Sequence, residues 1–216
     1  MNSVRLRKKP WVKEAILDYG DFVRQNVTEE VKGKWADDFG RTAPLHVELG
    51  CGKGDFITGM ALRHPEMNFI GIEAQLDVAY VAAKKVREAN LTNVRILVFN
   101  IEGITNIFEE GEVDRFYINF CDPWPKARHA KRRLTHRNFM NRYKGLLQKG
   151  GQIHFKTDNR PLFDFSLEEF AEIGCIVEDV SFDLHSENRP DNIRTEYEEK
   201  FSAKGFKINR CEIRFE

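Results

Sequence analysis

The glycine-rich turn that follows the first apolar run constrains the fold more than any other feature of this chain. The run Leu45–Leu49 carries Glu48 near its end and leads into Gly50, Gly52 and Gly54, which are spaced two apart. Glycine has no Cβ, so it can take a positive φ and let the backbone approach a ligand closely. The pattern predicts a buried parallel strand that ends in a sharp turn beside a bound nucleotide.

The spacing of these glycines separates two cofactor chemistries. A dinucleotide fingerprint, G-x-G-x-x-G, would place its third glycine at position 55, which is Asp55 in this chain. Asp55 therefore disfavours a Rossmann dehydrogenase. The observed E-x-G-x-G-x-G instead resembles motif I of the class I S-adenosylmethionine-dependent methyltransferases, and this resemblance implies S-adenosylmethionine as the cofactor.

Apolar runs and helical patterns alternate from residue 44 onward. We expect strands at 45–49, 68–73, 94–99, 113–120, 152–156, 176–182 and 206–215, and helices at 56–63, 76–89, 137–147 and 162–173. This order predicts an α/β fold with a mostly parallel seven-stranded sheet and helices on both faces. The resemblance to motif I implies that this is a single Rossmann-like class I methyltransferase domain. The two closing strands have no helix between them, so one antiparallel edge strand is expected. Residues 1–40 are interpreted as an N-terminal basic arm with some helix, and residues 41–216 as the methyltransferase domain.

The composition is typical of a soluble globular protein and excludes several classes. Lys+Arg and Asp+Glu both number 34, so any nucleic-acid signal must be local. The four cysteines show no C-x-x-C pair, which argues against a zinc site or disulfide framework and favours a reducing cytoplasm. The histidines have no partners at metal spacing, so no metal is expected. No apolar run approaches the roughly 18 residues of a membrane span, and the basic start, Arg5–Lys9, is not a secretory signal.

Polar side chains close the first three expected strands. Ligands of such sheets bind at the carboxyl ends of the strands, which makes Glu48, Glu73 and Asn100 candidates for the cofactor site. A carboxylate at Glu73 can accept both ribose hydroxyls, and the Asn100 amide can bond an adenine edge. A purely structural interpretation makes Glu48 a helix cap or a solvated loop acid and Asn100 a turn residue.

The fourth expected strand leads into the loop Asp122-Pro123-Trp124-Pro125-Lys126. Two prolines fix φ twice in four residues, so the loop is stiff and suited to hold a flat base at a fixed distance from a methyl donor. Trp124 offers a stacking face, and Asp122 offers acceptors for the N–H edge of a base. The next segment, 128–133, is a local positive patch that can neutralise phosphates, although charged runs are more often solvated loops.

D-P-W-P-K followed by R-H-x-K-R-R is similar to the signature of the bacterial tRNA (guanine-N7-)-methyltransferase family. The similarity extends over residues 45–216 and includes the glycine motif, G-I-E at 71–73, F-K-T-D at 155–158 and T-E-Y-E at 195–198. It implies methylation of guanine N7 in the tRNA variable loop, at position 46 in tRNA numbering, by a monomer or a homodimer. Some members carry aspartate at the position of Asn100, and either side chain can meet an adenine edge.

The resemblance also assigns site residues. Cofactor contacts are expected from Glu48, Gly50, Gly52, Gly54, Glu73, Asn100 and Asp122. Substrate contacts are expected from Lys126, Asp158, Thr195, Glu196, Tyr197 and Glu198, and RNA contacts from Arg128, His129, Ala130, Lys131, Arg132 and Arg133. Because guanine N7 carries a lone pair and no proton, we expect Asp122 to act by gripping the base and offsetting positive charge.

Alternatives remain open at this point. The D-P-W-P loop also resembles the D/N-P-P-aromatic loop of amino-methyltransferases that act on adenine or cytosine. A non-catalytic RNA-binding module that kept the fold is a further alternative. Thr195 followed by Glu198 fits a helix capping box, which is compatible with a substrate role. The basic start, Arg5–Lys9, either touches tRNA or is disordered in the free protein.

Overall fold

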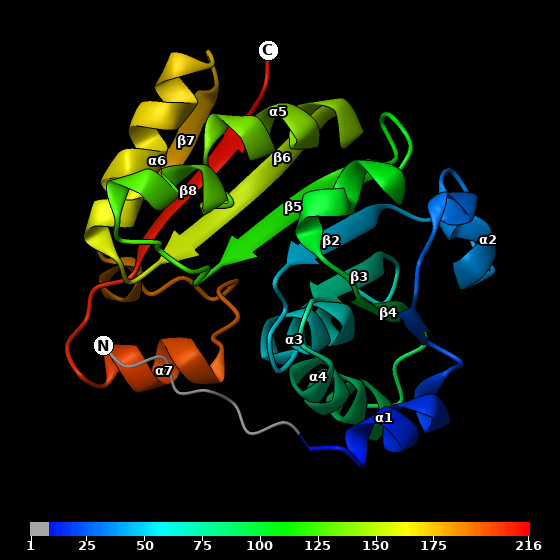
Figure 1. Cartoon of the computed structure of the whole chain (residues 1–216). Coiled ribbons are helices and arrows are strands. Elements are labelled where there is room, and N and C mark those ends of the chain that lie inside the picture. The colour runs from blue at the N-terminus through cyan, green and yellow to red at the C-terminus, as the bar shows by residue number, and fades with distance from the viewer. Residues whose placement is uncertain (1–8) are drawn as a thin grey trace.

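The computed structural model describes residues 9–216, and within this range the chain forms one eight-stranded sheet (Figure 1). The strand order is β1-β4-β3-β2-β5-β6-β8-β7, and only β8 runs antiparallel to its neighbours. The strands are β1 (Val23–Gln25), β2 (Leu45–Leu49), β3 (Asn68–Glu73), β4 (Val94–Val98), β5 (Val113–Asn119), β6 (Leu147–Thr157), β7 (Ile176–Ser181) and β8 (Asn209–Arg214). The predicted α/β fold with a mostly parallel sheet is confirmed.

Two details of the predicted sheet are wrong. The eighth strand, β1, is only three residues long, too short to show a period in the sequence, and it forms because it pairs with the open edge of β4. The antiparallel strand is not at the edge: β8 lies between β6 and β7 and bonds to both. Absence of a helix between two strands predicts that they pair, but it does not say which of them joins the rest of the sheet.

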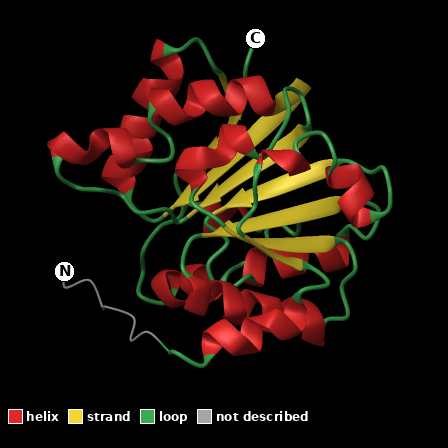
Figure 2. Ribbon diagram, turned by 45° about the vertical axis from the view of Figure 1, so that its right-hand side comes forward, coloured by secondary structure: helices red, strands yellow, loops and turns green. Residues whose placement is uncertain are grey.

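Helices cover both faces of the sheet, as expected (Figures 1 and 2). Helices α5 and α6 lie on one face and α1, α3 and α4 on the other, while α7 lies near the carboxyl ends of β6 and β5. The helices are α1 (Val12–Ala15), α2 (Trp35–Phe39), α3 (Asp55–Arg63), α4 (Leu76–Glu88), α5 (Arg137–Leu146), α6 (Arg160–Glu172) and α7 (Glu196–Ser202). Short 3-10 turns complete the chain: η1 (Ile16–Tyr19), η2 (Glu29–Val31), η3 (Ile101–Asn106), η4 (Ala127–Arg132) and η5 (Leu184–Glu187).

The two faces of β5 differ in chemistry. Phe116 and Ile118 are fully buried in the larger core cluster. The alternate residues Arg115, Tyr117 and Asn119 point to the other face and line a pocket. The sheet thus has an apolar face at β5 and a polar one, and the polar face is available for ligands.

Residues 9–40 contribute to the packing of the domain. Ile16 and Trp35 are buried, and the Trp35 indole N–H donates to the Ile107 carbonyl at 2.9 Å. β1 adds its strand next to β4. The division of the chain at residues 40 and 41 stays a prediction. Of the basic start, residues 5–8 lie outside the described part of the chain.

Candidate active site

The three glycines of the turn have two different roles. Gly50 and Gly52 have φ values of 81° and 55°, and a Cβ on either would meet nothing within 4 Å. Their positive φ is the reason for glycine, and the space beside them is open to a ligand. Gly54 also has a positive φ, 81°, but there a Cβ would lie 2.8 Å from the Cβ of Ala82. Gly54 therefore allows α3 to pack closely on α4.

Glu48 presents a buried acceptor beside this turn. The side chain is 3% exposed, and its Oε1 accepts a 2.9 Å hydrogen bond from the Asn119 amide. Its Oε2 is buried and has no hydrogen-bond partner within residues 9–216. Burial raises the pKa of Glu48 to about 8. A buried polar atom without a partner calls for an explanation, and a cationic ligand group that donates to Oε2 provides one.

Glu73 and Asn100 lie at the next two strand ends. Glu73 accepts hydrogen bonds from the backbone N–H of Gly52 at 3.2 Å and of Gln75 at 2.9 Å, so it also supports the glycine turn. Burial raises the pKa of Glu73 despite these two bonds. The Asn100 side-chain oxygen accepts from the backbone N–H of Glu102 at 3.0 Å and caps η3. Its amide N–H groups are then left for another partner.

One pocket of about 390 Å³ joins the predicted cofactor and substrate segments. The glycine turn and Glu48 form one side of it, and the start of α7 forms the other, although these segments lie far apart in the sequence. The lining residues are Glu48, Gly50, Cys51, Gly52, Lys53, Asp55, Val78, Asn119, Phe120, Thr195, Glu196, Tyr197 and Lys200. A cofactor held by the turn would therefore face α7 directly.

The loop after β5 is held in an unusual conformation. Phe120 and Trp124 have φ values of 53° and 41°, which non-glycine residues rarely adopt. The Arg133 guanidinium donates to the carbonyls of Pro123 and Trp124, both at 3.0 Å. The Arg132 guanidinium lies 5.0 Å from the centre of the Trp124 ring. These contacts, together with the prolines, keep the loop stiff, and such strain is typical of functional sites.

Asp122 is exposed on this loop, and its charge contributes to the raised pKa values of Glu73 and Tyr197. It is therefore close to both the cofactor side and the α7 side of the site. This position is compatible with the predicted role of Asp122, which stays a prediction.

The predicted RNA-binding segment, 128–133, lies in η4 and its C-cap, and its side chains have different roles. Arg128 and Lys131 are exposed, and within residues 9–216 neither is paired with a carboxylate. Arg133 braces the loop through two carbonyls, and His129 packs edge-on against Trp124. The remaining members are Ala130, whose carbonyl accepts from the Arg133 N–H, and Arg132, which lies over the Trp124 ring. Lys126, a predicted substrate contact, is exposed immediately before η4. Arg128 and Lys131 are thus available to bind a phosphate.

The start of α7 is anchored at each of its first residues. The Thr195 hydroxyl accepts from the backbone N–H of Glu198 at 2.9 Å, which confirms the predicted helix cap. Glu196 forms an ion pair with Lys53 at 2.7 Å. The Tyr197 ring centre lies 5.1 Å from that of Phe120, and its hydroxyl donates to Asp158 at 3.5 Å. Thr195, Glu196 and Tyr197 all line the shared pocket.

Glu198 differs from its neighbours because it is fully buried beneath the helix. It accepts from Lys156 at 2.9 Å, from His185 at 2.7 Å and from Asn192 at 2.8 Å. Burial alone would raise the pKa of Glu198, but the Lys156 charge and the hydrogen bonds outweigh it and lower the pKa. The structure places Glu198 as an anchor of α7, and its predicted substrate contact stays untested.

Two residues of the site were not predicted from the sequence. Asn119 holds Glu48 and lines the pocket, and Lys156 ties β6 to α7. Both are polar residues near the carboxyl end of a mostly apolar strand. This pattern could have identified them from the sequence, because an amide or ammonium group in a buried strand requires a hydrogen-bond partner.

No group of three or more His, Cys, Asp or Glu residues within residues 9–216 is arranged to hold a metal ion. None of the helices described there is long and apolar enough to cross a bilayer.

Solved structures with the same fold are methyltransferases. The chain superposes on the 16S rRNA methyltransferase KamB with a TM-score of 0.65 at 11% identity, covering 88% of this chain and 97% of that one. An antibiotic-related methyltransferase gives a TM-score of 0.63 at 16% identity, covering 87% and 94%. A family model described as "Putative methyltransferase" matches residues 42–211. Fold and site together define a Rossmann-like, class I methyltransferase.

Two curated relatives define the family more closely. The tRNA (guanine-N(7)-)-methyltransferase of Halalkalibacterium halodurans is 50% identical over 212 residues, which cover 98% of this chain and 96% of the relative. The protein of the same name from Bacillus subtilis is 48% identical over 210 residues, which cover 97% and 98%. The chain belongs to the tRNA (guanine-N7-)-methyltransferase family.

Proposed function

We propose that this chain transfers the methyl group of S-adenosylmethionine to N7 of a guanine in tRNA and yields N7-methylguanosine. The target is the variable-loop guanosine, position 46 in tRNA numbering. The observation that carries the proposal is the shared pocket, in which the glycine turn and Glu48 face the start of α7. Membership of the family supports the choice of tRNA guanine as the substrate.

The residues around the glycine turn fit S-adenosylmethionine. The unpartnered Oε2 of Glu48 suits the ammonium of its methionine portion, and Gly50 and Gly52 leave space for the chain beside it. Glu73 would accept the ribose hydroxyls, and Asn100 would meet the adenine edge. The bound cofactor supplies a methyl group activated by a sulfonium.

The other side of the site positions the base. Guanine N7 attacks the methyl carbon with its lone pair while the carbon–sulfur bond breaks, so no proton has to leave N7 first. Asp122 grips the base and offsets the positive charge that develops on the purine. Asp158 and Tyr197 complete the substrate side. Holding two reactants in line can supply about 7–11 kcal/mol of the barrier reduction.

Exposed cations next to the site would hold the RNA backbone. Arg128 and Lys131 are placed to neutralise phosphates, while Arg132 and Arg133 keep the loop in shape. We further propose that the enzyme needs no metal, acts in the cytoplasm and is either a monomer or a homodimer. An N-terminal arm, 1–40, accompanies the methyltransferase domain, 41–216.

The test is transfer of labelled methyl from S-adenosylmethionine to unfractionated tRNA, followed by digestion and identification of the labelled nucleoside. N7-methylguanosine is the expected product. N6-methyladenosine would instead support the amino-methyltransferase alternative, and tRNA binding without any label would support a non-catalytic module. Glu110→Ala, an exposed carboxylate at the far end of β5, serves as a control variant that keeps full transfer.

A further inference from the structure

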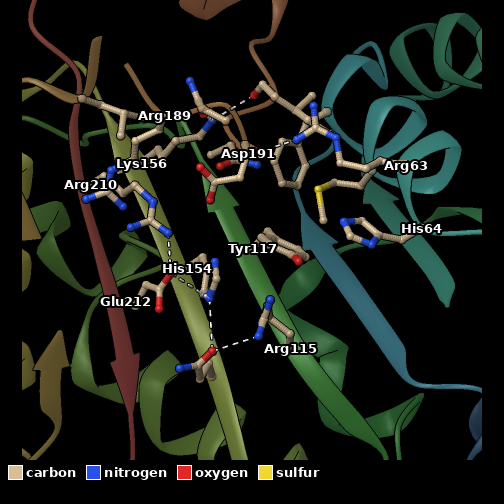
Figure 3. A pocket seen from close by; sticks show the side chains of 17 residues that line it. Arg63, His64, Arg115, Tyr117, His154, Lys156, Arg189, Asp191, Arg210 and Glu212 are labelled. Carbon is tan, nitrogen blue, oxygen red and sulfur yellow. Dashed lines mark hydrogen bonds and ion pairs between the residues drawn. The ribbon is translucent and has the colours of Figure 1, made fainter. Parts of the chain in front are cut away.

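A second pocket, of about 370 Å³, lies over the polar face of the sheet (Figure 3). Its floor is formed by alternate residues of three strands: Arg115, Tyr117 and Asn119 of β5, Gln152, His154 and Lys156 of β6, and Arg210 and Glu212 of β8. The end of α3 and the segment 189–193 form its walls. Only Asn119 also lines the pocket beside the glycine turn.

The floor of this pocket is not a conventional core surface. The opposite face of the same three strands carries apolar residues such as Phe116, Phe155 and Ile213, all buried in the main cluster. On the pocket side, every floor residue has a polar group. Figure 3 shows hydrogen bonds that link Gln152 to both Arg115 and His154 along this floor.

Of the five Lys and Arg side chains that line the pocket, two lack a charged partner within residues 9–216. Lys156 pairs with Glu198. Arg189 and Arg210 share Asp179, and each has a second carboxylate partner, Glu187 for Arg189 and Glu212 for Arg210. Each of these three is neutralised by a carboxylate, so none of them gives the pocket a surplus of charge.

Arg63 and Arg115 are not neutralised by any carboxylate of residues 9–216. Arg63 donates to the backbone carbonyl of Asp191 at 2.8 Å, and Arg115 donates to the Gln152 side chain at 2.9 Å. The Nε of Arg115 is buried and has no hydrogen-bond partner in the described part of the chain. Arg63 lies at the α3 wall and Arg115 on the floor, on either side of Tyr117 (Figure 3).

The buried His46 and His154 do not add to this charge at neutral pH. Burial, reinforced by the Arg115 charge, lowers the pKa of His46 to about 4 and that of His154 to about 2. His46 is bonded to the Tyr117 hydroxyl at 3.0 Å. The Asp191 carboxylate also lines the pocket and forms no ion pair among residues 9–216, so it offsets part of this charge. The remaining positive charge sits on the two guanidinium groups, which are the side chains best suited to grip an oxyanion.

We propose that this pocket is a phosphate-binding site in which Arg63 and Arg115 hold the phosphate oxygens from two sides. Arginine forks match phosphate geometry and pair with it bidentately. Phe56 and Met60 offer an apolar wall to the organic part of the ligand. The phosphate is carried either by a free small molecule or by bound RNA. The inference does not depend on the methyl-transfer proposal, because binding is measured without turnover.

Titration calorimetry of the full chain with pyrophosphate tests the site directly. The protein is saturated with S-adenosylhomocysteine so that the other pocket is filled, and the ionic strength is kept fixed. One saturable site is expected, and Arg63→Gln and Arg115→Gln should each raise its Kd at least about tenfold. Arg63 is exposed at the end of α3, so Arg63→Gln should keep the fold even if Arg115→Gln does not. Arg142→Gln, exposed on α5 across the sheet, removes the same charge and should leave the Kd unchanged.

Addition of tRNA distinguishes the two phosphate sources. If the phosphate belongs to RNA, tRNA displaces pyrophosphate and Arg63→Gln weakens tRNA binding. If it belongs to a small molecule, both ligands bind together and Arg63→Gln leaves the tRNA affinity unchanged. Two results together overturn the proposal. Pyrophosphate either does not bind or binds equally to all three variants, and the tRNA affinity is also the same in all three.

Discussion

The two halves of the sheet's carboxyl edge differ in how their charges are compensated. At β2 and β3, Glu48 and Glu73 accept hydrogen bonds from amide N–H groups, and no cation of residues 9–216 is paired with them. At β6, the buried Lys156 is paired with Glu198. The acidic half thus keeps unneutralised acceptors for a cationic cofactor. The basic half neutralises its buried cation and leaves its unpaired charge on exposed residues such as Arg128, where a polyanion can reach it.

Asp122→Ala should produce the largest effect, because Asp122 lies between the two halves. We expect a loss of about 1000-fold in kcat for methyl transfer to tRNA, in the range found when one group that stabilises transition-state charge is removed. Since Asp122 is exposed, Tm should not change. Steady-state transfer of labelled methyl measures the loss, with Glu110→Ala as the matched control. Wild-type turnover of Asp122→Ala would remove Asp122 from the mechanism.

Lys156→Met tests whether the basic half depends on its internal pair. Removal of one partner leaves Glu198 buried without a counter-charge, and such changes cost about 3–5 kcal/mol. We expect a fall of about 3 kcal/mol in the free energy of unfolding, measured by urea denaturation. Arg160→Met breaks the exposed pair with Asp164 and should cost much less. Equal costs for the two variants would show that the buried pair has no special role.

The acidic half should respond to pH. Without a ligand, Glu48 is protonated below about pH 8, because burial raises its pKa. A cationic ligand group favours the carboxylate, so binding below that pH must release a proton. The contribution of Glu48 to S-adenosylhomocysteine affinity should therefore fall about tenfold for each pH unit below 8 and level off above it.

Calorimetry of the wild type and of Glu48→Gln across pH 6–9 measures this contribution. By the same linkage, the affinity of the wild type should change about tenfold for each pH unit below 8. The amino group of the ligand titrates equally in both experiments, so the difference between them isolates Glu48. Parallel pH profiles for the two proteins would mean that Glu48 does not meet the ligand.

The exposed cations should act on RNA alone. Arg128→Gln combined with Lys131→Gln should weaken tRNA binding and reduce the slope of log K against log salt by about 2, one unit for each lost phosphate contact. Affinity for S-adenosylhomocysteine should be unchanged. Lys84→Gln with Lys144→Gln, on α4 and α5, is the control of equal charge. An unchanged salt slope in the first double variant would place the RNA elsewhere.

Thr195→Val should have the smallest effect, because it removes one helix cap. Loss of such a cap costs about 1 kcal/mol of stability. The measurement is again urea denaturation, with Thr92→Val, which lies in the turn before β4, as a control. A much larger loss would mean that Thr195 supports more than the first turn of α7.

The sequence predicted the parallel strands because their apolar runs are continuous and their ends are polar. Leu45–Leu49 and Asn68–Glu73 have the predicted bounds. The place of β8 between two strands was not predictable in this way, because its apolar pattern does not encode its partners. The three residues of β1 are a strand only because β4 offers an open edge.

The site shows the same limit at single residues. Motif spacing identified Gly54, but its contact with Ala82 depends on the packing of two helices. The T-E-Y-E motif marked Glu198 together with Thr195, yet folding directs Glu198 inward to Lys156. Sequence patterns thus select which segments meet, and the fold decides which side chain of a segment faces the ligand.

A crystal structure of the chain with S-adenosylhomocysteine and a guanosine nucleotide tests the central claim most directly. The account predicts the ligand's amino group at Glu48, its ribose at Glu73, and its sulfur directed at a base held between Asp122 and the start of α7. A cofactor bound away from the glycine turn, or a sulfur directed away from α7, would contradict the claim that the two halves of the edge form one active site.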